Sequence, residues 1–279
     1  MKNVKLLITV FLISIVTFFS CQKDNLKIEY QSNVEKSLGA IQDDPKEVAK
    51  VPLYKNSSQS LTSLPSSFVL NAPIPGNQGS EGSCMSFSVA STVSIEWYYR
   101  YAYTSFSNST NVFSPEYLYD YAVQTPGSCG SGSSLLTNLN LVRDSGVCTW
   151  ATLPYTSGSC TPRVTSAIRS DAVAHKLSNY SRLICNDTNS IKNYVYTKHP
   201  VIVSITVDNN FKNAKAGYIW KTYGTAYGSH AFIIIGWDDS KRAYKIMNSW
   251  GTSWGDAGFL WVDYGIISNK SFYYVYYFN

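Results

Sequence analysis

A cysteine at the start of an apolar segment is the clearest chemical signal in the sequence. Cys84 ends a Gly/Ser-rich stretch, and the segment 85–99 that follows has the length and weak helical spacing of a buried helix. At a helix N-terminus, unpaired N–H groups and aligned peptide dipoles favour a thiolate. Because a thiolate paired with a base is a strong nucleophile, Cys84 is a candidate for covalent catalysis. An inert buried thiol is the alternative.

Two later stretches offer a base and a partner for it. His230 enters a strand-like apolar run, 230–237, and Asn248 ends the segment 244–248 before a turn rich in Trp and Gly. A cysteine nucleophile needs an imidazole to take its proton and a third group to orient the ring. Taken singly, His230 is equally a hydrogen-bonded core residue and Asn248 a turn former. Together with Cys84 they form a candidate set for nucleophilic catalysis by a cysteine paired with a base.

The order and spacing of these three residues resemble those of the papain-like cysteine peptidases. The resemblance covers roughly residues 65–279 and includes the Gln-Gly…Gly-Ser-Cys approach to Cys84 and the Asn-Ser-Trp-Gly turn. It implies that Asn248 orients His230, and that Gln78 donates a hydrogen bond beside the Cys84 backbone N–H to form an oxyanion hole. It also implies an α+β fold of two lobes, one helical and one an antiparallel barrel-like β lobe, with the active-site cleft between them.

The resemblance extends to residues that would contact substrate. Its glycine-bearing loop matches a Cys-Gly-Ser-Gly stretch here, in which Gly132 lies nearest the substrate and Ser131 replaces a family glycine. Ser229 directly precedes His230 and is a further candidate. Aligning the last strand puts Lys270 near the floor of the pocket for the residue before the one cleaved, where a cation favours acidic or polar side chains. A solvent-facing turn lysine is the alternative.

The chain departs from the family pattern at two disulfide positions. The resemblance implies that Cys129 would pair with position 81 and Cys160 with position 121, but the residues there are Glu81 and Tyr121. We therefore expect Cys129 and Cys160, which both lack the partner that the family pattern implies, to pair with each other. Glu81 also brings a carboxylate close to the nucleophile, which raises a thiol pKa.

The other cysteines leave two arrangements open. Cys148 and Cys185 either bond to each other or remain buried thiols, and a local bridge from Cys148 to Cys160 is the main rival to the pairing above. The cysteines form no Cys-x-x-Cys motif, and no histidine accompanies them. The sequence therefore predicts neither a metal site nor a cofactor.

The N-terminal part of the chain reads as targeting sequence rather than fold. Residues 1–20 have a basic start and an apolar stretch of signal-peptide length that runs into Cys21, which resembles a lipidation site. This predicts an exported outer-membrane lipoprotein, facing the periplasm or the cell surface and held to the membrane by its lipid alone; a secreted soluble protein is the alternative. Residues 21–64 are polar and predict a flexible tether or short pro-segment, and inhibition of the enzyme by this segment is the alternative. Residues 65–279 form the peptidase domain.

Composition excludes some partners and leaves others open. Only 15% of the residues are charged, and the formal net charge of +5 is spread evenly, so no nucleic-acid partner is predicted. The expected partner is a protein or peptide substrate, and the oligomeric state is left open. An endopeptidase is the leading hypothesis. The alternatives are an exopeptidase, another amide-bond hydrolase or a transamidase, and a non-catalytic surface binding protein on the same frame.

Local patterns predict the elements that would position these residues. Ser114 followed by Pro is a helix start, and Gly146 ends a second predicted helix, 134–144. Alternating β-branched residues and intervening Gly, Asp or Asn predict strands in the second half of the chain. These strands are expected at 201–207, 230–237, 243–247, 259–263 and 272–278.

Overall fold

The computed structural model describes residues 36–54, 63–159 and 163–278. All of them belong to one compact unit, Val34–Asn279. The predictions for the signal peptide, for Cys21 and for Cys160 lie outside the described residues. Within these ranges, no helix combines the length and apolar character that crossing a membrane requires.

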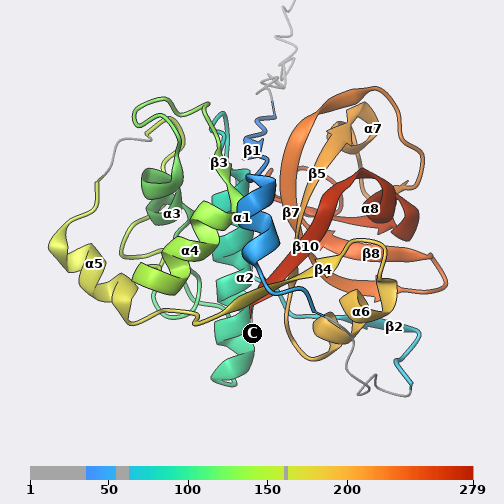
Figure 1. The fold of residues 1–279 in the computed structure, drawn as a ribbon, viewed down its shortest axis with the longest axis horizontal. Helices are drawn as coiled ribbons and strands as arrows, with labels where there is room; N and C mark the ends of the chain where they lie inside the picture. The colour runs from blue at the N-terminus through green and yellow to red at the C-terminus, as the bar shows by residue number, and fades with distance from the viewer. Residues whose placement is uncertain (1–35, 55–62, 160–162, 279) are drawn as a thin grey trace, which may run out of the picture. The chain divides into compact units, whose positions relative to one another are not determined.

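Helix α2 (Cys84–Arg100) stands at the junction between a helical part and a β-rich part of the molecule (Figure 1). Nearly all of its side chains are buried, including hydroxyls that bond within the helix, such as Thr92 Oγ1 to the Ser88 carbonyl at 2.9 Å. Small side chains let neighbouring elements approach closely, which explains why the sequence shows only a weak apolar stripe here. The predicted helix at 85–99 is confirmed.

The helical part contains α3 (Pro115–Ala122), α4 (Leu135–Ser145) and α5 (Ser166–Val173). The predicted start of α3 is confirmed: Ser114 Oγ accepts a hydrogen bond from the Tyr117 N–H at 3.1 Å. Helix α4 ends at Gly146, whose φ of 80° lies in the left-handed region that glycine adopts without strain.

The β-rich part is a single mixed sheet, in the order β4-β10-β5-β7-β8-β9-β6, with β2 paired to β7. Most pairs are antiparallel, but β6 and β9 run parallel. The sequence predicted an antiparallel barrel-like lobe, whereas this sheet is mixed and does not close into a barrel. The strands are β2 (Ser67–Val69), β4 (Tyr180–Ile184), β5 (Val201–Asp208), β6 (Ile219–Trp220), β7 (Ala226–Asp238), β8 (Ala243–Met247), β9 (Phe259–Asp263) and β10 (Ser271–Phe278); helices α6 (Thr188–Tyr196), α7 (Asn209–Lys212) and α8 (Tyr264–Lys270) complete this part.

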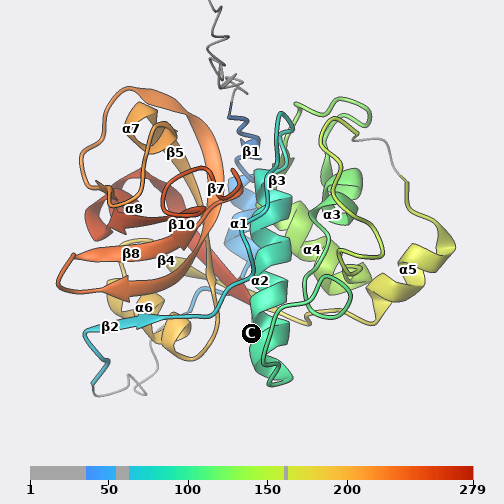
Figure 2. The same cartoon turned by 180° about the vertical axis from the view of Figure 1, so that it is seen from behind.

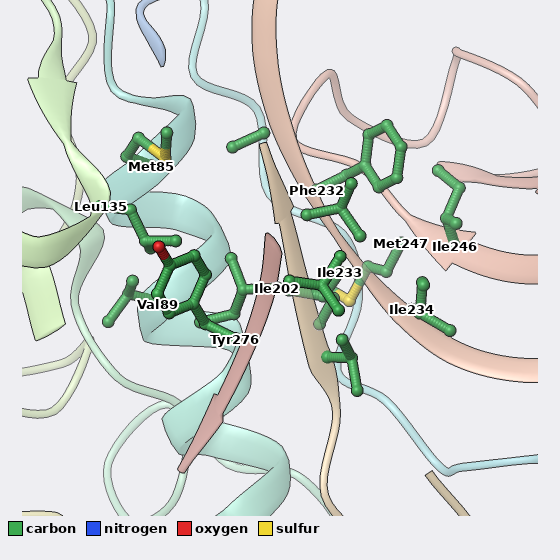
Figure 3. Packing of buried hydrophobic residues seen from close by; sticks show 14 of the residues in the cluster. Met85, Val89, Leu135, Ile202, Phe232, Ile233, Ile234, Ile246, Met247 and Tyr276 are labelled. Carbon is green, nitrogen blue, oxygen red and sulfur yellow. The ribbon is translucent and has the colours of Figure 1, made fainter. Parts of the chain in front are cut away.

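The core joins the two parts. Ile233 of β7 lies opposite Met247 of β8, and Figure 3 shows both near Ile202 of β5. On the α2 side, the same view shows Tyr276 of β10 beside Val89 and Leu135. The five strands predicted in the second half are all present, because each carries enough β-branched and aromatic side chains to be buried on the sheet.

Residues 36–54 differ from the expected flexible tether. They form strand β1 (Ala40–Ile41) and helix α1 (Pro45–Lys50), which run along the junction between the two parts (Figures 1 and 2). Strand β1 pairs in parallel with β3 (Ser133–Ser134), and the Asp44 side chain caps α1 by accepting from the Lys46 N–H. Contacts with distant parts of the chain order this polar segment, and its own sequence gives no periodic sign of them.

Candidate active site

Cys84 is the first residue of α2 and has no exposed surface. Burial raises the pKa of its thiol to about 12, although hydrogen bonds from the backbones of Ala231 and Met85 act in the opposite direction. The helix N-terminus was expected to favour the thiolate. In this arrangement desolvation outweighs that effect, so Cys84 holds a neutral thiol.

His230 lies on β7, next to the residue whose backbone contacts the Cys84 thiol, and is fully buried. Its Nε2 is 2.7 Å from Asn248 Oδ1, so Nε2 carries a proton and donates it. Nδ1 is buried without a hydrogen-bond partner among the described residues. The Trp250 ring stacks on the imidazole, with centroids 4.5 Å apart, and shields it from water.

Burial also lowers the pKa of His230 to about 4, while the bond to Asn248 acts in the opposite direction. The two pKa shifts favour a neutral imidazole and a neutral thiol. The ring has the tautomer that a general base needs, with its unprotonated nitrogen uncommitted. The structure thus brings His230 and Asn248 together and places the Cys84 thiol beside the backbone of Ala231, the residue after His230.

Gln78 precedes α2 and is fixed through all of its polar groups. Its side-chain Oε1 accepts from Ser249 Oγ at 2.7 Å, and its backbone N–H donates to the Ser249 carbonyl at 2.9 Å. Nε2 carries two protons: one goes to the Glu81 carbonyl at 2.7 Å and the other to the Leu38 carbonyl at 3.0 Å. The Nε2 group predicted as the oxyanion donor is therefore already hydrogen-bonded to the Leu38 carbonyl, which belongs to the N-terminal segment 36–54.

Gly39, the next residue of that segment, packs closely between the backbones of Gly82 and Gly132. Gly39 has φ of +123°, and a Cβ built on it would lie 2.1 Å from the Gly82 carbonyl oxygen. On the other side, a Cβ on Gly132 would lie 2.4 Å from the Gly39 oxygen. The Ser133 N–H donates to that same oxygen at 3.1 Å. Gly132, predicted to face substrate, faces residues 38–40 instead.

The start of the segment is anchored beside His230. Trp250 Nε1 donates to the Ser37 carbonyl at 2.9 Å. Lys36 Nζ donates to the Lys212 carbonyl at 3.1 Å and lies 5.4 Å from the centre of the Trp250 ring. Burial, followed by the charges of Lys215 and Lys212, lowers the pKa of Lys36 to about 8.

A cavity of about 300 Å³ lies between α1, the start of α4, and strands β5 and β10. The domain contributes Leu135, Ser204 and Phe272 to its walls, and the segment contributes Ile41. Ser204 pairs with Ala231, the residue after His230, and its buried Oγ has no hydrogen-bond partner in the described chain. Lys270 is not among the residues that line this cavity.

Lys270 itself lies elsewhere. It is the last residue of α8, and its ammonium is 4.3 Å from the centre of the Tyr223 ring. Ser229 pairs with Thr206 on β5, directly before His230, as its sequence position requires. Ser131 turns back into its own loop, where its Oγ accepts from the Thr125 N–H at 3.3 Å. The sequence analysis did not identify four residues of this region: Leu38, Gly39, Ser204 and Phe272. Only Phe272 had a sequence signal, because it lies in the predicted final strand.

The cysteines follow the expectation in part. Cys129 is disulfide-bonded, and its expected partner, Cys160, lies outside the described residues. Cys148 and Cys185 are free and buried, which rules out a bond between them and the Cys148–Cys160 rival. Among the described residues, no group of three His, Cys, Asp or Glu side chains is arranged to hold a metal ion.

Comparison with known proteins agrees with this geometry. A model of the family described as "Papain family cysteine protease" matches residues 72–273. A cysteine protease of Blomia tropicalis is 30% identical over 67% of this chain and 56% of its own length, and gamete and mating-type specific protein A of Dictyostelium discoideum is 28% identical over 66% and 39%. The chain thus spans about half the length of these relatives. The structure of xylellain, a cysteine protease from Xylella fastidiosa, superposes with a TM-score of 0.76 at 22% identity, covering 88% of this chain and 97% of that one.

Proposed function

The chain belongs to the papain family of cysteine proteases, and on that premise we propose that it hydrolyses peptide bonds through Cys84. The observation that carries the proposal is the hydrogen bond from His230 Nε2 to Asn248, which leaves Nδ1 available as the base. Cys84 Sγ attacks the substrate carbonyl while His230 takes the thiol proton. Gln78 Nε2 donates to the developing oxyanion.

Collapse of this intermediate breaks the C–N bond and leaves a thioester on Cys84. His230 gives its proton to the leaving amine, and water, deprotonated by the same ring, then hydrolyses the thioester to a carboxylic acid and the free thiol. Asn248 keeps the ring in place through both proton transfers. Each residue therefore has one role that its hydrogen bonds in the structure already support.

The protein is latent while residues 36–41 occupy the cleft. The Leu38 carbonyl occupies the donor that an oxyanion would use, and β1 runs along the loop that would pair with substrate. Strand β1 pairs with Ser133 and Ser134 of β3, directly after Gly132, so an extended substrate cannot pair with this loop while the segment is in place.

The main alternatives share the site but not the product. An exopeptidase, another amide-bond hydrolase or a transamidase would use the same thioester, and a non-catalytic binding protein would have no need for all four side chains. Cleavage of a peptide library by the wild type but not by Cys84→Ala supports the peptidase, and internal cleavage distinguishes an endopeptidase from an exopeptidase. Retained turnover in Cys84→Ala contradicts the mechanism. Failure of iodoacetamide to label Cys84 under any condition favours the binding protein.

Export and lipidation of Cys21 are proposed from the sequence alone, because an apolar stretch of signal-peptide length runs directly into that cysteine. Such a protein would face the periplasm or the cell surface and would be held by its lipid. Radiolabelled fatty acid should enter the wild type and not Cys21→Ala. A mature N-terminus well beyond residue 21 contradicts the proposal.

A further inference from the structure

The hydroxyl of Tyr155 lies at the centre of a compact hydrogen-bond network beside the active site. It is 2.6 Å from Glu81 Oε2, 2.7 Å from Ser83 Oγ and 2.9 Å from the Gln78 carbonyl oxygen. All three partners belong to the short stretch that leads into Cys84. One side chain therefore ties together the whole approach to the nucleophile.

Glu81 is held as firmly from its other oxygen. Its Oε1 accepts from the Ser159 N–H at 2.9 Å, and the residue has no exposed surface. A buried carboxylate is costly unless hydrogen bonds replace its hydration, so these donors fix where Glu81 lies. The Tyr155 ring packs edge-on against Phe87 of α2, with centroids 4.6 Å apart, so the hydroxyl is held in place as well.

The loop that carries Tyr155 is fastened to α3 by two further carboxylates. Glu116 Oε2 accepts from the Thr156 N–H at 2.9 Å and pairs with Arg163, and Asp120 accepts from the Arg163 N–H at 3.1 Å. Thr156, next to Tyr155, and Arg163 are thus both held against α3.

This network controls the direction of the oxyanion donor. Gln78 Nε2 has two protons, and the Glu81 backbone carbonyl takes one of them, at 2.7 Å. The Glu81 carbonyl on Nε2, together with the Ser249 hydroxyl on Oε1, then sets the direction of the second proton, which points at the Leu38 carbonyl. Tyr155 donates its one hydroxyl proton to the Glu81 carboxylate and so fixes Glu81, and the Gln78 carbonyl lies 2.9 Å from the same oxygen as the alternative acceptor.

We infer that Tyr155, acting with Glu81, is a positioning residue for the oxyanion donor Gln78. The inference rests on the proposed peptidase function. The family resemblance places a disulfide cysteine at position 81, and here the hydrogen-bonded Glu–Tyr pair performs the cross-linking role. Tyr155 contacts no reacting atom, so its effect reaches the transition state only through Gln78.

The test uses the full-length chain carrying Gly39→Ala, which is expected to free the cleft. Tyr155→Phe should lower kcat on a peptide substrate about tenfold and leave KM unchanged, since total loss of one oxyanion donor costs about 10²–10³ in rate. Affinity for a peptide aldehyde, whose adduct carries the oxyanion, should fall by a similar factor. Alkylation of Cys84 by iodoacetamide forms no oxyanion and should keep its rate. Tyr180→Phe, which loses a 2.6 Å bond to Asn140, is the matched control and should change none of these.

Two further variants separate positioning from a loss of folding. In a Gln78→Ala background, Tyr155→Phe should cost nothing more, because the donor it positions is gone. Glu81→Gln should retain activity, because its amide can donate to Tyr155 while the Tyr155 hydroxyl donates to the Gln78 carbonyl; Glu81→Ala should resemble Tyr155→Phe.

Three outcomes are decisive. Equal losses from Tyr155→Phe with and without Gln78, or equal losses in aldehyde affinity and alkylation rate, overturn the inference and leave the peptidase intact. A Gly39→Ala parent that alkylates but cleaves no peptide overturns the proposed function itself.

Discussion

Replacing Gly39 by alanine should release the N-terminal segment from the cleft. The new Cβ would lie 2.1 Å from the Gly82 oxygen, 2.3 Å from its carbonyl carbon and 2.4 Å from its Cα, and none of these backbone atoms can swing aside. A Cβ in the left-handed region costs roughly 1–2 kcal/mol, and overpacking adds about 1–3 kcal/mol. Docking should therefore weaken by about 2–5 kcal/mol, which corresponds to roughly 30-fold to several thousand-fold.

The assay is the rate at which iodoacetamide alkylates Cys84 at pH 7, followed by peptide mass spectrometry. With the segment docked, a thiol whose pKa is about 12 is almost fully protonated and reacts slowly. In Gly39→Ala the rate should rise at least 30-fold, and peptide turnover should rise with it. Gly217→Ala is the control, because its φ is also positive, at 80°, but its Cβ meets no atom within 4 Å. Equal alkylation rates in the wild type and Gly39→Ala would refute the reasoning.

Three other predictions follow from the site. Docking of the N-terminal segment lowers the pKa of Lys36 from 10.5 to about 8, so the docked state favours the neutral amine. Docking should therefore strengthen as pH rises above about 8. In that pH range, the rate of Cys84 alkylation in the wild type should fall relative to the rate in Lys36→Gln. In the Gly39→Ala chain, Asn248→Ala should reduce kcat less than His230→Ala, since a misoriented ring still transfers protons part of the time; equal losses would contradict this. Phe272→Ala should enlarge the cavity and raise kcat/KM for substrates with a bulky side chain at the residue before the one cleaved, relative to substrates with a small side chain there. Lys270→Glu should leave that preference unchanged.

Features encoded within a few residues were predictable. Ser114 before a proline and Gly146 after an apolar helix act through local backbone geometry, so their effects need no knowledge of the rest of the chain. The ordered motifs around Cys84, His230 and Asn248 predicted the papain family for a different reason, because three weak signals in sequence order restrict one another.

Features that depend on distant partners were not predictable. Residues 36–54 are polar and lack periodicity, and what orders them is a fit to Gly82, Gly132 and other residues far along the chain. Glu81 was recognised as a departure, but its partner Tyr155 lies in a loop that no pattern links to it. The position of Lys270 was not predictable either: α8 extends to that residue before the last strand begins, and its ammonium lies over the Tyr223 ring.

The covalent connection between the inhibitory segment and the cleft has a consequence for how latency responds to concentration. A segment joined to its binding site is present at an effective concentration of about millimolar, so even modest contacts at Gly39 keep the cleft filled. Dilution does not weaken this arrangement, since no second molecule takes part. A single backbone cut between α1 and the domain would turn the same contacts into an ordinary bimolecular equilibrium. At a nanomolar concentration of enzyme, the freed peptide would then dissociate and remain unbound unless its Kd were also nanomolar.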